Sequence, residues 1–189
     1  VMDDFIYGEP QALDSTGRDA AATDGVYVGA VAGTDAYLAV TSDGDEFRGY
    51  VCDGEGLSTW IGAAPLAGAT AELVTREGET IGTVTFAGGA ATGTVSVAGA
   101  EHDFTADEAT GDAGLYRATP GAPDAPVSAE PGWVEIGWIV LTDGTQRGVV
   151  EQDNLLRRAP RLVPGTTTSV DWGDGSPVTV GVMDPDIDF

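Results

Sequence analysis

Short turns rich in glycine recur along most of this 189-residue chain, and no other feature constrains its fold as strongly. Between residues 25 and 118, apolar and polar residues alternate, and such a turn interrupts them about every 8 to 12 residues. A period of two is typical of strands that bury one face, and tight turns join antiparallel neighbours. The sequence therefore predicts an all-β fold, an antiparallel meander of about eight strands that forms a small barrel or a sandwich.

Pairing residues across the turns gives a first map of the interior. The four predicted hairpins close on Asp43-Gly44, Glu77-Gly78, Gly88-Gly89 and Gly99-Ala100, with Val40 opposite Phe47, Phe86 opposite Ala91 and Val95 opposite Phe104. All four place the same apolar set on one face, and a slip of one residue would turn every side chain over. The predicted interior consists of Leu38, Phe47, Val51, Trp60, Leu73, Val84, Phe86, Val95 and Phe104.

The stretch GYVCDGEGLSTWIG, residues 49–62, contains the only cysteine and one of the four tryptophans. A four-residue loop over residues 53–56 would turn Trp60 inward beside Gly49, where the missing side chain leaves room for an indole. Cys52 has the opposite parity and lies beside Asp53, whose carboxylate disfavours a thiolate. We therefore expect Cys52 to be structural rather than a nucleophile or a metal ligand.

The chain divides into four parts. We expect an N-terminal arm or linker in residues 1–24, the meander in 25–118, a proline-rich connector in 119–132, and further β-hairpins with an acidic tail in 133–189. Residues 154–161, NLLRRAPR, form the only local cluster of positive charge. That cluster is either an ordinary loop that balances nearby acid, a cover for a sheet end, or a surface for an acidic partner.

Charge and composition exclude several classes of function. The chain has 31 acidic residues and eight basic ones, all of them arginine, and its net charge is -23. Because binding to phosphates needs clustered cations, we exclude nucleic acid and anionic membrane surfaces as partners. No apolar run approaches the roughly 20 residues of a membrane-spanning helix. A GC-rich genome and a salty habitat both explain such acidity.

Few residues are available for catalysis. His102 is the only histidine, so metal sites with several histidines are excluded, and its parity near a strand end favours a partly buried, hydrogen-bonded side chain. The sequence contains neither a G-x-S-x-G elbow nor a phosphate-binding GKS or GKT motif. We therefore expect a protein that is not an enzyme.

Calcium is the one cofactor that the acidic residues favour, because it takes oxygen ligands from carboxylates and carbonyls. The candidate ligands are Asp171 and Asp174 in DWGDGSP and the alternately spaced Asp184, Asp186 and Asp188 at the C-terminus; Asp43, Asp45 and Glu46 form a third cluster. Each cluster taken alone is more often a solvated turn, so the sequence predicts either no cofactor or a calcium ion.

Several segments between residues 25 and 150 resemble a known pattern: VYVGAVAG, AYLAVTSDG, FRGYVCDG, STWIGAAPLAG, FTADEATGDAGLYRA and GWIVLTDGTQRGVV. They are similar to an uncharacterised family of exported actinobacterial domains, often attached to envelope proteins. The most specific elements are YVCDG at residues 50–54 with Trp60, and GLYR at residues 114–117. The resemblance implies a β-rich, non-catalytic module at the cell surface or outside the cell, and it assigns no catalytic residues. Export also fits a chain that begins at Val1, from which a leader would have been removed.

Three functions remain open. The first is an exported structural or assembly module of the cell envelope or an extracellular assembly, which acts through protein-protein contacts or self-assembly. The second is a barrel that binds a small apolar molecule, and the third is a calcium-stabilised surface domain. The bulk of the predicted interior favours the first. For that function we expect Phe5, Ile6 and Tyr7 of the arm to dock on a sheet edge or groove, of the same chain or of another copy; the alternative is a loose terminus.

Overall fold

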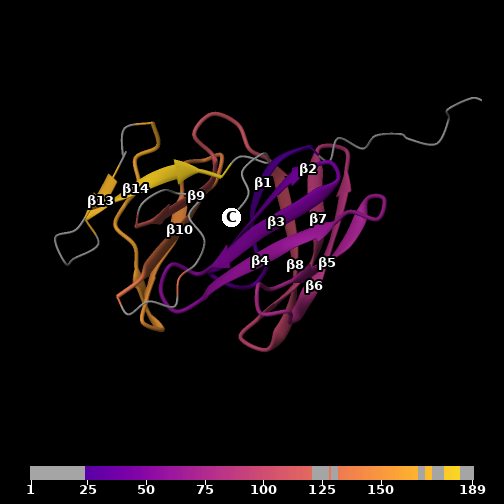
Figure 1. Cartoon of the computed structure of the whole chain (residues 1–189). Coiled ribbons are helices and arrows are strands. Elements are labelled where there is room, and N and C mark those ends of the chain that lie inside the picture. Colours follow the sequence, from indigo (N-terminus) through magenta and orange to yellow (C-terminus); the bar gives the residue numbers. More distant parts are fainter. Residues whose placement is uncertain (1–23, 121–127, 129–131, 166–168, 172–176, 184–189) are drawn as a thin grey trace, which may run out of the picture.

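The computed structural model describes residues 24–120, 128, 132–165, 169–171 and 177–183. These residues form fourteen strands and no helix, which confirms the predicted all-β fold. The strands make two antiparallel sheets, one of eight strands and one of six, which lie side by side (Figure 1). No helix among the described residues is therefore available to span a membrane.

The eight-stranded sheet curls into a nearly closed barrel, in the order β4-β3-β2-β1-β8-β7-β6-β5. The bounds of its strands are β1 Asp24–Ala30, β2 Tyr37–Asp43, β3 Glu46–Cys52, β4 Ser58–Pro65, β5 Thr70–Val74, β6 Thr80–Ala87, β7 Ala90–Val97 and β8 Ala100–Glu108. A single bridge between Ile61 and Thr75 joins the two edge strands, β4 and β5. The N–H of Arg76 also donates to the carbonyl of Trp60 at 3.1 Å, so this seam is short but bonded.

Side chains fill the barrel interior. Every predicted interior residue except Trp60 belongs to one buried cluster. The ring of Phe86 stands edge-on to the rings of Tyr27 and Phe47, with centroids 5.3 and 6.2 Å apart. Such arrangements are the favoured contacts between aromatic rings, and they leave the centre of the barrel packed.

Two predicted hairpin registers are shifted by two residues. The Gly88-Gly89 hairpin is confirmed, with Phe86 opposite Ala91. In the β2-β3 hairpin, however, Val40 pairs with Gly49 instead of Phe47, because Gly44 at a φ of 93° takes the first central position of the turn.

In the β7-β8 hairpin, Val95 pairs with His102 instead of Phe104. Ala98 and Gly99, at φ angles of 53° and 80°, form the centre of that turn, and no sequence pattern predicts that an alanine adopts the left-handed region. A slip of two residues keeps each side chain on its face, so the interior was still predicted correctly.

Trp60 is the exception, and its predicted position in the barrel interior is wrong. Ile61 pairs with Gly49 and points inward, whereas Trp60 pairs with Tyr50 and points out of the barrel. The cause lies in the preceding loop, where Asp53 Oδ1 accepts the backbone N–H groups of three later residues, Glu55, Gly56 and Leu57, at 2.8 to 2.9 Å. These bonds hold a loop over residues 53–57, one residue longer than predicted, and a shift by one residue turns the strand over.

The six-stranded sheet has the order β12-β11-β10-β9-β14-β13. The bounds of its strands are β9 Gly114–Thr119, β10 Val134–Val140, β11 Gln146–Gln152, β12 Leu155–Arg158, β13 Ser169–Asp171 and β14 Pro177–Val182. The sheet boundary lies between β8 and β9, so β9 leaves the range of 25–118 that we assigned to the meander. The β-hairpins expected in residues 133–189 are present as β10-β11, which turns around Asp143-Gly144, and as β13-β14.

Another buried cluster joins the two sheets. Its residues come from the outer face of β1 to β4, from β9 to β11 and from the residue after β14, and they are Val28, Ala39, Tyr50, Cys52, Trp60, Leu115, Ile139, Val149 and Met183. Gly137 of β10 allows the close approach, since a Cβ atom there would lie 2.5 Å from the Tyr50 ring and 2.9 Å from the Trp60 ring. A glycine inside a strand often marks such a contact.

Candidate functional site

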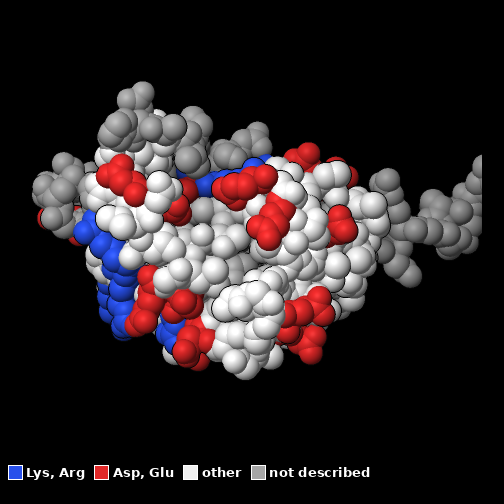
Figure 2. Space-filling model, turned by 90° about the horizontal axis from the view of Figure 1, so that it is seen from below, with Lys and Arg blue, Asp and Glu red and all other residues white. Residues whose placement is uncertain are grey.

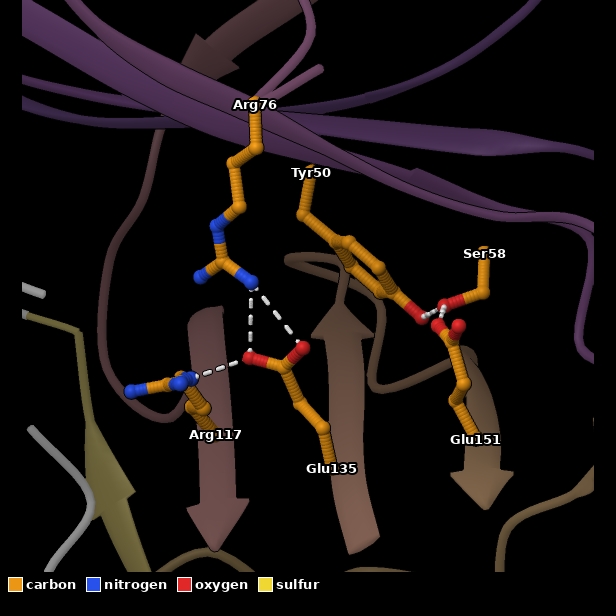
Figure 3. Close-up of polar contacts among 6 residues, drawn as sticks. All are labelled: Tyr50, Ser58, Arg76, Arg117, Glu135 and Glu151. Carbon is orange, nitrogen blue, oxygen red and sulfur yellow. Dashed lines mark hydrogen bonds and ion pairs between the residues drawn. The ribbon is translucent and has the colours of Figure 1, made fainter. Parts of the chain in front are cut away.

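A buried ionic cluster lies where the barrel meets the six-stranded sheet (Figure 3). Glu135 of β10 is its centre: Arg117 Nε of β9 donates to Oε1 at 2.6 Å, and Arg76 Nη1 donates to both carboxylate oxygens at 2.9 Å. The Arg117 side chain is fully buried, Glu135 is 7% exposed and Arg76 is 20% exposed. Because Arg76 comes from the barrel, this carboxylate ties the two sheets together.

Aromatic rings cover the same cluster. Tyr50 and Trp60 stack with centroids 4.2 Å apart, and the guanidinium groups of Arg76 and Arg117 lie 4.7 and 5.7 Å from the Trp60 centroid. A cation over an indole face is favourable, particularly where water is excluded. The rings therefore help to compensate the burial of both arginines.

Glu151 extends the polar network along β11. It lies directly opposite Glu135 in the β10-β11 ladder, a placement that is unfavourable for two like charges. The Ser58 hydroxyl donates to Glu151 Oε2 at 3.4 Å and contacts the Tyr50 hydroxyl at 3.1 Å. Burial, and then the charge of Glu135, raise the pKa of Glu151, while burial raises the pKa of Tyr50 well above its ordinary value.

Cys52 also belongs to this junction. It is fully buried, and burial is the main cause that raises the pKa of its thiol to about 12. A thiol with so high a pKa is a poor nucleophile at neutral pH, which supports the expected structural role of Cys52. We interpret the junction as a structural link between the sheets.

A groove of about 550 Å³ opens on the surface beside the junction, outside the barrel. The barrel contributes the β1-β2 and β3-β4 loops through Asp35 and residues 53–55, and the six-stranded sheet contributes β10, β11, the end of β12 and residues 159–161. Three arginines line it, Arg147, Arg158 and Arg161, and we call it the arginine groove.

The walls of the groove are held in place by specific bonds. Arg147 Nε donates to the carbonyl of Asp35 at 3.2 Å, and its guanidinium lies 4.8 Å from the centroid of the Tyr37 ring. On the opposite side, Arg158 forms an exposed ion pair with Glu55. Partial burial works to raise the pKa of Asp53 at the base of that loop, but the N–H donors of Leu57, Glu55 and Gly56 together lower it.

The segment after β12 is fixed across the sheet. Gln146 exchanges two hydrogen bonds with the backbone of Leu162, at 2.8 and 2.9 Å, and the Trp138 indole donates to the carbonyl of Pro160 at 2.9 Å. Trp138 can lie there because β11 has Gly148 beneath it, where a Cβ atom would approach the indole to 2.3 Å. Arg161 is thus presented from an anchored segment.

The cluster of positive charge at residues 154–161 is therefore an edge strand with an anchored extension rather than an ordinary loop. All four residues of β12 are exposed, among them Leu155 at 72% and Leu156 at 36%. On the face shown in Figure 2, most of the basic atoms lie on the part of the molecule that contains the six-stranded sheet, together with acidic atoms, and the charged atoms on the barrel are mostly acidic. The groove residues Arg147, Glu55 and Asp35 were not predicted, since they are far apart in the sequence and each belongs to an ordinary loop or strand.

The predicted metal ligands are only partly within the described residues. Asp171 is an exposed residue of β13, whereas Asp174, Asp184, Asp186 and Asp188 lie outside the part of the chain that the structure describes. Within the described ranges, no three His, Cys, Asp or Glu side chains come together as a metal site. The cluster at Asp43, Asp45 and Glu46 is a turn, because Asp43 Oδ1 accepts the N–H groups of the other two at 2.9 and 2.8 Å.

Of the remaining predicted positions, His102 can be placed. His102 is half-buried, and its Nδ1 lies 3.0 Å from the carbonyl oxygen of Ala32, an acceptor, so this nitrogen carries the proton. The expectation of a hydrogen-bonded histidine is confirmed. The arm residues Phe5, Ile6 and Tyr7 lie outside the described residues.

Comparisons with protein-family models, with curated proteins and with solved structures find no match to this chain.

Proposed function

We propose that this chain is an exported, non-catalytic assembly module of the cell envelope or of an extracellular structure, which binds acidic protein segments through β12 and the arginine groove. The observation that carries the proposal is the composition of this one surface. It combines an exposed strand edge, two exposed leucines and several arginines on a chain with a net charge of -23.

The distribution of positive charge supports a protein partner. Four of the eight arginines, Arg147, Arg157, Arg158 and Arg161, fall within fifteen residues of sequence. A local positive surface on an acidic molecule attracts acidic segments, whereas the acidic remainder of the molecule repels them, so charge directs an acidic partner to this surface. An exposed edge supplies backbone hydrogen bonds to an added strand.

The other two candidate functions have less support. A barrel that holds a small apolar molecule needs a hollow interior, and in this barrel the interior positions are occupied by packed side chains. For a calcium-stabilised domain, Asp171 is the described candidate ligand, and no group of three His, Cys, Asp or Glu side chains forms a metal site among the described residues.

Binding of a defined peptide tests the proposal. The probe is a fluorescein-labelled decapeptide of alternating aspartate and valine, with a lysine-valine decapeptide as its control, and fluorescence anisotropy is the readout. We expect the acidic peptide alone to bind, and the double variant Arg157→Gln/Arg158→Gln to weaken binding at least about tenfold, because it removes the local charge.

A variant with the same change in net charge provides the control. Thr92→Asp/Ser96→Asp adds two negative charges at exposed positions of β7, on the barrel. We expect it to change the affinity less than about twofold, because screening limits the reach of exposed charges. Equal losses in both double variants, or no binding of the acidic peptide, would overturn the proposal.

A further inference from the structure

The edge strand β12 has a definite hydrogen-bonding polarity. It pairs with β11, which is its only strand neighbour within the described part of the chain. Ala159 N donates to the carbonyl of Gly148, and hydrogen-bonded pairs alternate in an antiparallel ladder. The backbone N–H and C=O groups of Leu156 and Arg158 therefore point away from β11 and can bond to an added strand.

The sequence of β12 restricts which partner strand can complement it. It reads Leu155-Leu156-Arg157-Arg158, so two apolar residues precede two cations. In an antiparallel partner, directly opposite residues share a face and interact as pairs. The complementary partner therefore carries two acids followed by two apolar residues.

The N-terminal arm contains this complement. Residues 3–6 read Asp-Asp-Phe-Ile, and in antiparallel register Asp3 lies opposite Arg158, Asp4 opposite Arg157, Phe5 opposite Leu156 and Ile6 opposite Leu155. The other acidic segment, residues 184–189 with the sequence DPDIDF, fits less well. Every register of it that spans β12 places an aspartate opposite a leucine. The complementarity thus selects the arm.

The attachment point of the arm is compatible with pairing between two molecules. The described chain begins at Asp24, which pairs with Asp43 beside the β2-β3 turn. β12 meets the barrel at Glu55, in the β3-β4 loop at the opposite end of β3. The arm is therefore attached at the end of the barrel that is remote from its own β12.

We infer that residues 3–6 of one copy add as an antiparallel strand to β12 of a second copy, in the register given above, an inference that rests on the proposed function. Phe5 then covers Leu156, Ile6 covers Leu155, and the two aspartates meet the two arginines, with Glu55 sharing Arg158. The donor segment and the acceptor edge are different surfaces, so the contact is head-to-tail and builds rings or open chains unless two copies exchange arms.

Mixing of two impaired full-length variants tests the pairing. Asp3→Asn/Asp4→Asn weakens the donor, and Arg157→Gln/Arg158→Gln weakens the acceptor. We expect the unmodified chain to self-associate, each double variant to raise its dissociation constant at least about tenfold, and the mixture to form a species of twice the 19.2 kDa chain mass, because only one competent junction remains. The charge-exchanged chain Asp3→Arg/Asp4→Arg/Arg157→Asp/Arg158→Asp should associate again. Light scattering after size exclusion measures all of these.

The register is tested by crosslinking. Residues 155 and 6 form a pair without hydrogen bonds between the two strands, where Cα atoms lie about 4.5 Å apart, within the range of a disulfide. Chains with Ile6→Cys and chains with Leu155→Cys, mixed under mild oxidation, should give a covalent dimer. Ile6→Cys with Arg158→Cys, three residues out of register, should not. The exposure of Leu155 makes its replacement compatible with folding.

Controls separate this inference from the proposed function. Asp184→Asn/Asp186→Asn changes the net charge as much as the donor variant does, and it should leave self-association unchanged. A monomeric unmodified chain, including one whose arm occupies its own β12, overturns the inference, and so does equal weakening by both aspartate variants. If the acidic decapeptide still binds, the proposed function stands without it. If the decapeptide does not bind, the proposed function fails instead.

Discussion

The barrel interior and the junction between the sheets are both buried, but they are built in different ways. The barrel interior contains an apolar cluster whose members come from hairpins that are neighbours in the sequence. The junction brings together Arg76, Arg117 and Glu135 from three separated segments, under the stacked rings of Tyr50 and Trp60. Apolar packing is tolerant of small shifts, whereas a buried ion pair requires exact partners. The junction therefore fixes how the two sheets are placed, whereas the barrel interior can absorb small changes in packing.

The largest expected effect concerns the barrel. Phe86→Ala removes the ring that contacts Tyr27 and Phe47 and leaves a cavity in a packed interior. We expect the free energy of unfolding to fall by about 4 kcal/mol in urea denaturation. A loss below about 1 kcal/mol would show that the interior is loosely packed and would weaken the distinction between the regions.

Glu135→Ala is the corresponding change at the junction. It leaves Arg117 buried without its carboxylate, and we expect the free energy of unfolding to fall by about 3 kcal/mol. This value is at the lower end for a broken buried ion pair because Arg76 is partly exposed. Replacing the triad, as Arg76→Met/Arg117→Met/Glu135→Leu, should restore stability to within about 1 kcal/mol of the unmodified chain.

The buried thiol of Cys52 reports on the junction in the same experiment, since its alkylation requires the sheets to separate. In Glu135→Ala, the free energy of local opening calculated from the labelling rate of Cys52 should fall more than the free energy of global unfolding does. Equal changes would mean that barrel and junction open as one unit.

Gly137→Ala tests the closeness of the junction directly. The added methyl group would meet the rings of Tyr50 and Trp60 and force them or β10 to shift. We expect the free energy of unfolding, measured by thermal denaturation, to fall by about 2 kcal/mol, as is usual for overpacking. Gly78→Ala provides a contrasting site, because a Cβ atom there meets nothing within 4 Å, although its φ of 88° makes some backbone strain unavoidable. A neutral Gly137→Ala would contradict the tight contact.

The smallest effect depends on pH. Burial raises the pKa of Glu151 in the folded state above its ordinary value of 4.5, so the folded chain holds this proton more tightly than the unfolded chain. The stability that this contributes is complete below pH 4.5 and is lost as the pH rises through the folded pKa. Glu151→Gln should therefore melt higher than the unmodified chain at pH 7, and the difference should shrink as the pH falls toward 4.5. A difference that is independent of pH would exclude this cause.

Much of the barrel could be predicted from the sequence, and the candidate site could be predicted only in part. Alternation identified Leu38, Val84 and Phe104 as interior, even where a register was shifted by two residues. It failed at Trp60, because the three hydrogen bonds to Asp53 Oδ1 changed the loop length by one residue. At the site, the charge cluster at residues 154–161 was visible, while its partner Glu55 was not.

The sequence by itself determined that the chain is all-β, which face of each barrel strand is buried, and that its positive charge is concentrated near residue 157. These properties depend on neighbours in the chain, through the two-residue period and the turn residues. Only the tertiary structure decided that β9 joins the second sheet, that Arg76 reaches Glu135 across 59 residues, and that β12 lies at an open edge beside the arginine groove. Such contacts depend on how two sheets pack against each other, and a close approach such as that at Gly137 exists only after both sheets have formed.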